Sequence, residues 1–220
     1  MVNKFGSYLP SLVLFLGAIT ASAQTSLVPA GAVCKYLDNG SSPTDLDNGS
    51  LPPGWTTRDF LEVGWGSGDA ELGYNTDNRE PAEVTKVSYG PNSSSKYITT
   101  YFRHLFIVAD PLLFYAMKLR LQRDDGTVVY LNGEVVHRTN MPEGAVSSTT
   151  LALAAVGGAD ESTFFPTELS NGLVTGTNVL AVEIPQHLAN SKDISFNLEL
   201  LRLTSWPQVQ PRIMSELKST

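Results

Sequence analysis

The sequence predicts an all-β protein in which antiparallel strands form a β-sandwich or a barrel. Apolar and polar residues alternate with a period of two along most of the second half of the 220-residue chain. That alternation is typical of strands with one face on a core and one wetter face. Turn-forming pairs such as Asn132-Gly133 and Asn171-Gly172 separate the runs, as expected for short strands. Almost no stretch shows the 3.6-residue period of an amphipathic helix.

Residues 1–23 are expected to be a secretory signal peptide. Lys4 supplies a small positive charge, a short apolar stretch interrupted by Pro10 follows, and Ala21-Ser22-Ala23 gives a cleavage pattern before Gln24. The apolar stretch is too short for a comfortable membrane span. We therefore expect an exported chain, extracellular or periplasmic, with no membrane insertion. A retained N-terminal anchor is the alternative.

The charge balance excludes some classes of partner. The formal net charge is −7, and it becomes −8 without the single lysine of the signal peptide. An acidic chain without a basic stripe is not typical of proteins that bind nucleic acid or anionic membranes. Cys34 is the only cysteine, so no internal disulfide forms, and we expect this cysteine to be buried as a small apolar residue.

Period-two runs place the main strands at residues 97–108, 116–124, 177–184 and 193–201. The segment 116–124 shows the pattern clearly, because three apolar side chains alternate with three polar ones: Met117, Leu119 and Leu121 against Lys118, Arg120 and Gln122. Residues 38–96 are rich in Gly, Pro, Asn and Ser, and they predict long loops with short strands at 60–64 and 84–89. Residues 205–220 predict a linker or a disordered tail.

The stretch RDDGTVVYLNGEVVHR, residues 123–138, predicts a β-hairpin. Asn132-Gly133 favours a type I′ turn, because both residues tolerate positive φ. Simple pairing outward from this turn places Tyr130 and His137 on one face, opposite Leu131. Asp124 and Asp125 end the preceding strand before Gly126, where a bend is needed and where Asp and Gly are favoured. A role in the bend accounts for both acids, and ligand contact is the alternative.

Three stretches together resemble the galactose-binding-like modules of secreted bacterial proteins: DDGTVVYLNGEVVHR, GLVTGTNVLAVEI and DISFNLELL. They are also similar to the sugar-binding domain of family 2 glycoside hydrolases. The upstream order Trp55, Phe60, Trp65 agrees with this resemblance, although the family usually carries an Asp-Asp pair where this chain has Leu61 and Glu62. The resemblance covers roughly residues 27–204 and implies a β-sandwich of jelly-roll, galactose-binding-like topology.

The same resemblance implies a secreted, non-catalytic carbohydrate-binding or accessory module with a glycan as its partner. Modules of this kind adjoin metallophosphoesterase, hydrolase or cell-surface domains, so other domains of a larger protein are expected partners too. Two alternatives stay open. One is a structural or adhesive surface domain without a small ligand. The other is a fragment of a larger secreted hydrolase, such as a metallophosphoesterase or a glycoside hydrolase.

No catalytic residues are predicted. The three histidines show no H-E-x-x-H spacing, and no G-x-S-x-G nucleophile motif occurs, so we expect no enzyme activity from this chain alone. Sugar sites combine aromatic faces with a few polar groups. The candidate ligand-binding residues lie in or beside the hairpin: Asp124, Asp125, Tyr130, Asn132, His137 and Arg138. Trp55, Phe60 and Trp65 are expected instead to plug the ends of the sandwich.

One structural calcium ion is implied by the resemblance, and no other cofactor is expected. Asp45 and Asp47 in TDLDNG offer the oxygen ligands that calcium prefers. The alternative is an Asx-rich loop that bonds its own backbone. The RDDG…YLNG stretch has a faint similarity to the protective-antigen-type lectin domain, in which an Asp-Asp pair serves calcium and sugar.

Overall fold

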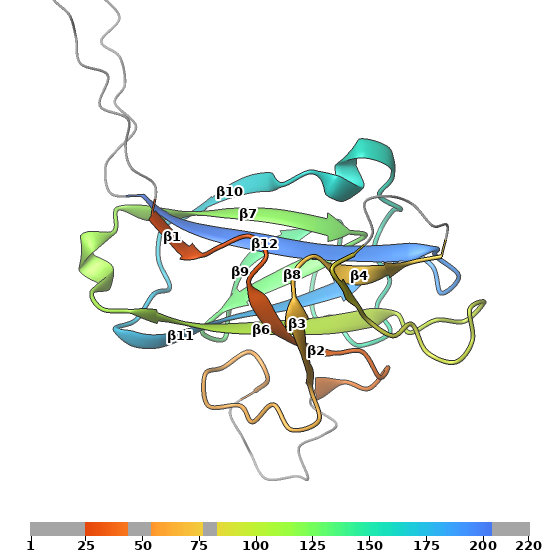
Figure 1. Ribbon diagram of the computed structural model, residues 1–220. Coiled ribbons are helices and arrows are strands. Elements are labelled where there is room, and N and C mark those ends of the chain that lie inside the picture. Colours follow the sequence, from red (N-terminus) through yellow and green to blue (C-terminus); the bar gives the residue numbers. More distant parts are fainter. Residues whose placement is uncertain (1–24, 44–53, 77–82, 204–220) are drawn as a thin grey trace, which may run out of the picture.

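The computed structural model describes residues 25–43, 54–76 and 83–203, and these form two β-sheets packed face to face (Figure 1). The strands follow one another as β1 (Thr25–Val28), β2 (Val33–Leu37), β3 (Gly66–Asp69), β4 (Leu72–Asn75), β5 (Thr85–Lys86), β6 (Thr99–Val108), β7 (Ala116–Asp124), β8 (Thr127–Leu131), β9 (Glu134–Thr139), β10 (Phe165–Leu169), β11 (Gly176–Pro185) and β12 (Asp193–Leu203). The short 3-10 helices η2 (Pro111–Leu113) and η3 (Gly158–Ser162) lie in connections between the described strands. The expected all-β sandwich is confirmed.

Each sheet contains strands from distant parts of the chain. The β7 sheet has the order β10-β7-β12-β4-β5, with β1 also paired to β12. The β6 sheet has the order β3-β2-β6-β11-β8-β9. The pairs are antiparallel except for β4 with β5, which are parallel. Asp125 and Gly126 join β7 to β8, so two residues carry the chain from one sheet to the other.

The core lies between the sheets and follows the predicted alternation. Leu119 and Leu121 of β7 are buried in one cluster with Leu180 and Val182 of β11, on the opposite sheet. Phe102 of β6 stacks on a ring of the other sheet, that of Phe196 in β12, with 4.3 Å between the centroids. Burial of such side chains supplies most of the stabilisation of a sandwich without disulfides.

The four main strands predicted from period two are confirmed as β6, β7, β11 and β12. The short strand predicted at 60–64 is wrong, because this segment is irregular and the next strand begins at Gly66. Phe60 is buried in an aromatic cluster, while Leu61 and Val63 are both 78% exposed. The alternation there reflects one anchored ring rather than a paired strand.

The sequence predicts that the aromatic residues of the 54–65 segment plug the ends of the sandwich, and this prediction is wrong. Trp55, Phe60 and Trp65 form a second cluster on the outer face of the β6 sheet, with Leu37, Tyr101 and Ala181. In Figure 1 the orange segment between β2 and β3 lies on the side of this sheet away from the other sheet. The long loop thus turns an outer face that the alternation marks as wetter into a buried one.

The hairpin forms with the predicted turn but with a different register. Asn132 and Gly133 have φ angles of 53° and 98°, and Tyr130 pairs with Val135 as predicted. The register then shifts, so that Val129 pairs with His137 and Val128 with Arg138. A bulge of this kind inserts one residue in one strand. The predicted face of His137 is therefore wrong: it shares the inner face with Val129, and Arg138 moves to the outer face.

Cys34 is 3% exposed and packs in the main core cluster, which confirms its prediction as a buried apolar residue. Burial raises the pKa of its thiol to about 12. In the part of the chain that the structure describes, no helix has the length and apolar character needed to cross a bilayer.

Candidate functional site

A pocket of about 360 Å³ lies on the outer face of the β6 sheet, and we call it the aromatic pocket. Its volume is at the lower end of the range of small-ligand sites. Strands of this sheet contribute Tyr101, Tyr130 and Glu183, and two loop segments add the remaining described lining residues: Ser42, Trp55, Val146, Ser147 and Ser148. Three aromatic rings thus lie beside hydroxyl groups and one carboxylate.

The three rings hold one another in place. Trp55 contacts Tyr101 edge to face with 5.1 Å between the centroids, and Tyr130 in the same manner with 5.5 Å. Such pairs contribute about 0.5–1.5 kcal/mol beyond the area that they bury. Tyr130 is half-buried, and Tyr101 is 3% exposed. The pocket therefore has a fixed aromatic wall, and Tyr130 is its more accessible tyrosine ring.

Glu183 is the acid of the aromatic pocket. It lies on β11, is 3% exposed, and accepts a hydrogen bond from the Tyr130 hydroxyl at 2.7 Å between the oxygens. Burial raises the pKa of Glu183 above its ordinary value, although the hydrogen bond from Tyr130 and the nearby charge of Arg138 oppose the rise. Burial and this carboxylate together also raise the pKa of Tyr130. The hydroxyl therefore stays protonated and acts as a donor.

Arg138 lies behind the pocket rather than in its lining. Its Nη1 donates to the carbonyl of Pro142 at 2.6 Å. This bond ties β9 to the segment 141–152, in which Met141 and Ala152 pack on Val128. The bulge in β9 is what brings Arg138 to this face of the sheet. Tyr130 and Arg138 are the two predicted site residues that the fold places near Glu183.

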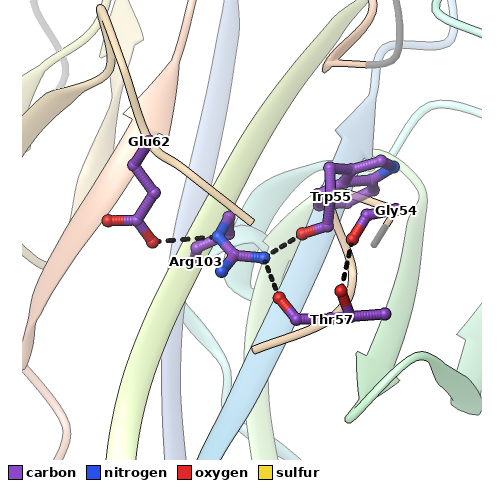
Figure 2. A network of polar contacts seen from close by, with 5 residues as sticks. All are labelled: Gly54, Trp55, Thr57, Glu62 and Arg103. Carbon is purple, nitrogen blue, oxygen red and sulfur yellow. Dashed lines mark hydrogen bonds and ion pairs between the residues drawn. The ribbon is translucent and has the colours of Figure 1, made fainter. Parts of the chain in front are cut away.

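Arg103 fixes the wall that carries Trp55 (Figure 2). It lies on β6, is 1% exposed, and forms an ion pair from Nε to Glu62 at 2.9 Å. Its Nη1 donates to the backbone carbonyls of Trp55 and Thr57, and its guanidinium lies 5.1 Å from the ring centroid of Phe60. Burial lowers the pKa of Arg103, and Glu62 opposes that change. Glu62 therefore anchors the segment 54–65 to β6 through this ion pair.

Asp125 ties three segments of the chain together. It is 1% exposed, and its two carboxylate oxygens accept hydrogen bonds at 2.7 Å from the backbone N–H groups of Val156 and His187. Its own carbonyl accepts from the Asn140 side chain at 3.1 Å. Gly126 follows with no room for a side chain, because a Cβ there would lie 2.5 Å from the sulfur of Met141. The carboxylate is thus used to hold backbone at the crossing between the sheets.

Asn132 is also used within the fold. Its Nδ2 donates to the side chain of Asn178 and to the carbonyl of Gly172, both at 2.8 Å, and its Oδ1 accepts from the backbone N–H of Val179. These bonds fasten the hairpin turn to β11. Asn132 therefore lies apart from the aromatic pocket, although it belongs to the same hairpin as Tyr130.

Asp124 lies on the other sheet. It is 1% exposed at the end of β7, opposite Ser195 of β12. Its carboxylate, that of Asp193 and that of Glu161 in η3 each offer an oxygen, and these oxygens lie within 4.8 Å of one another. Carboxylate oxygens are the ligands that calcium prefers. Among the described residues this trio has the spacing for a divalent cation, whereas Asp45 and Asp47 lie outside the described residues and that metal site stays a prediction.

His137 lies on the inner side of the β6 sheet, away from the aromatic pocket. It is half-buried, and its Nδ1 lies 3.4 Å from the hydroxyl of Thr167 in β10. Burial lowers the pKa of His137, and the nearby charge of Arg123 lowers it further. The six predicted site residues are therefore spread over five places in the fold, of which the surroundings of the aromatic pocket, with Tyr130 and Arg138, are one.

Glu183, Tyr101 and Arg103 were missed by sequence reasoning. Each is a polar or aromatic residue within a strand whose other residues are largely apolar. A lone Glu183 within VLAVEIP and a lone Arg103 within TTYFRHLF are the signals that were present. A charged residue at such a position needs a partner once it is buried, but the sequence alone does not show the burial.

Comparisons with known proteins give matches among solved structures. No family model matches the sequence, and a comparison with curated proteins gives no match. Among solved structures, a β-glucuronidase of an uncultured Clostridium sp. matches 87% of this chain at 12% identity with a TM-score of 0.48. Bifidobacterium dentium β-glucuronidase matches 84% at 16% identity and 0.44, and Bacteroides uniformis β-glucuronidase 2 matches 82% at 13% identity and 0.49.

The matched region is a small part of each of these enzymes. This chain covers 31% of the Clostridium chain, 31% of the Bifidobacterium dentium chain and 18% of the Bacteroides uniformis chain. It therefore spans less than one third of the length of these solved structures.

Proposed function

We propose that this chain is a secreted, non-catalytic carbohydrate-binding module and that the aromatic pocket is its glycan site. The observation that carries this proposal is the meeting of Trp55, Tyr101 and Tyr130 with Glu183 in one hollow of about 360 Å³. Sugars present apolar C–H faces and a rim of hydroxyl groups. Aromatic surface with a few aimed hydrogen-bonding groups is the usual composition of a site for such ligands.

The polar groups suit a sugar better than an apolar ligand. Glu183 accepts hydrogen bonds, and within the described chain the hydroxyl of Tyr130 donates to its Oε1. Ser147 and Ser148 add polar residues to the same lining. A buried carboxylate that accepts from a ligand hydroxyl forms a charge-assisted hydrogen bond, which is stronger than a neutral one.

The test is a binding measurement on purified protein, first on a glycan array and then by calorimetry with the glycans that bind. Tyr130→Ala removes the accessible ring, and we expect at least about a tenfold loss of affinity, because aromatic contacts dominate many binding sites. Tyr115→Ala is the matched control, since Tyr115 is an exposed tyrosine that precedes β7 on the other sheet.

Each alternative predicts a different result in this test. A structural or adhesive domain without a small ligand gives no binding to any glycan on the array. Hydrolysis of a glycan by the purified chain contradicts a non-catalytic role. If the Tyr130→Ala and Tyr115→Ala variants bind the glycan with equal affinity, the glycan binds outside the aromatic pocket.

We further propose that the chain serves as an accessory part of a larger secreted hydrolase. The sequence resemblance supports this, because such modules adjoin hydrolase domains. Mass spectrometry of exported protein tests the secretion step, with Gln24 expected at the mature N-terminus. An intact Met1 on exported material contradicts it.

A further inference from the structure

The charge of the aromatic pocket is one-sided. Glu183 is the ionisable acid among the described residues that line it, and none of the described lining residues is a lysine, an arginine or a histidine. The remaining described lining residues are uncharged at neutral pH: three aromatic residues, three serines and one valine. A ligand in the pocket therefore meets a carboxylate without a facing cation.

The burial of Glu183 strengthens the electrostatic effect of its carboxylate on a ligand. Glu183 is 3% exposed, so little water lies around it to screen its charge. Coulomb interactions strengthen as the local dielectric constant falls. A second carboxylate brought into the same hollow would lose its own hydration and would also be repelled by Glu183.

Arg138 is the cation that offsets Glu183 in part. It is close enough to oppose the rise in the pKa of Glu183, but its Nη1 is held by the carbonyl of Pro142 at 2.6 Å. It does not contribute to the described lining. The charge of Arg138 therefore affects a ligand only through its electrostatic field, whereas Glu183 lines the pocket itself.

We propose that the aromatic pocket selects neutral sugars and amino sugars and rejects uronic acids. This inference rests on the proposed glycan-binding function. Glu183 accepts hydrogen bonds from the hydroxyl groups of a neutral sugar, and from the ammonium group of an amino sugar it also gains an ion pair. A uronic acid differs from its neutral counterpart by one carboxylate, and this group finds no facing cation in the lining.

The experiment compares matched ligand pairs by calorimetry at low ionic strength and neutral pH, where the amino sugar still carries its ammonium group. The probes are the methyl glycosides of glucose, galactose and mannose, each with its uronic acid counterpart, together with methyl glucosaminide. We expect the neutral member of at least one pair to bind about tenfold or more tightly than its uronic acid, because like charges in a binding site cost several kcal/mol. The glucosaminide is expected to bind at least as well as the glucoside.

Variants assign this selectivity to the carboxylate. Glu183→Gln keeps the size of the side chain and removes its charge, so the ratio of neutral to uronic affinity is expected to fall toward one. Arg138→Gln removes the opposing charge and is expected to keep or increase that ratio. The wild-type comparison stands by itself if Glu183→Gln fails to fold.

The outcomes separate the two proposals. Equal binding of a sugar and its uronic acid by the wild type, or tighter binding of the uronic acid, overturns the selectivity while leaving glycan binding intact. An unchanged ratio in folded Glu183→Gln also overturns it. Absence of binding to every probe and to the glycan array overturns the glycan-binding function, and the selectivity with it.

Discussion

Replacing Asp125 by alanine tests whether this acid holds the fold or binds a ligand. The side chain is 1% exposed, and it accepts two hydrogen bonds at 2.7 Å from the backbone N–H groups of Val156 and His187. A hydrogen bond to a charged group contributes about 1.5–3 kcal/mol. Asp125→Ala removes both bonds and leaves two backbone donors to find water or stay unpaired.

The sum of the two bonds gives the size of the expected effect. We expect a loss of about 3–5 kcal/mol in the free energy of unfolding, since larger losses from one substitution are exceptional. For a domain of this size, each kcal/mol lowers the melting temperature by about 2–4 °C, which gives a fall of about 6–20 °C. Asp125→Asn is expected to lose less, because its amide oxygen still accepts one of the two backbone N–H groups.

The measurement is thermal unfolding followed by circular dichroism, with a chelator and with calcium. The carboxylate of Asp125 accepts hydrogen bonds from backbone N–H groups. The fall in melting temperature for Asp125→Ala is therefore expected to be the same with chelator and with calcium. A variant that melts like the wild type in chelator, but loses a calcium-dependent or glycan-dependent rise seen in the wild type, would refute this reasoning. That result would make Asp125 a ligand-binding residue.

Three other predictions follow from buried groups. Arg103→Met breaks the ion pair with Glu62 and should lower the free energy of unfolding in urea by about 3 kcal/mol. As the control, Arg120→Met removes an ion-paired side chain that is 42% exposed and should lower it by under about 1 kcal/mol. Equal losses would contradict the role of Arg103 in holding the 54–65 segment. Because the folded-state pKa of His137 is lowered, stability is fully present above the ordinary value of 6.5 and falls as the pH drops below it; His137→Gln should flatten this fall in melting temperature, and an unchanged profile would exclude His137 as its source. The thiol of Cys34, with its pKa raised to about 12, should stay unlabelled by a thiol reagent in native protein and react in urea, so fast native labelling would contradict its burial.

The sequence predicts the strands that make the core because their pattern has one physical cause. In β7 and β12, leucines at alternate positions are buried in the core between the sheets, as with Leu119 and Leu121 in β7, and hydrophobic burial on one face imposes a period of two. The short strands lack this signal. The residues of β3 are Gly66 to Asp69, with no large apolar side chain, and β4 carries Leu72 and Tyr74 beside a glycine. Their pairing is set by long-range partners, which a local pattern does not report.

The hairpin shows how a single bulge limits prediction of the site. The turn at Asn132-Gly133 is determined locally by two residues that tolerate positive φ, so it is predictable. The bulge at Val136 is not predictable, because Val135 and Val136 are adjacent valines and the sequence suits either register. One inserted residue exchanges the faces of His137 and Arg138. The prediction therefore named the right hairpin and the right pairing for Tyr130, but it placed His137 instead of Arg138 on the face of Tyr130.

The residues that the sequence analysis missed share a second cause. In a two-layer sandwich, the face of a strand that points away from the core is expected to be wetter, so Glu183 and Arg103 resemble ordinary solvated charges. Here two loop segments cover that face, and both side chains are at most 3% exposed. A buried charge needs a partner: Arg103 has Glu62 and two carbonyls, whereas Glu183 has one hydroxyl from Tyr130. The two buried charges therefore lie in different environments, one in an ion pair with Glu62 and the other beside the hydroxyl of Tyr130.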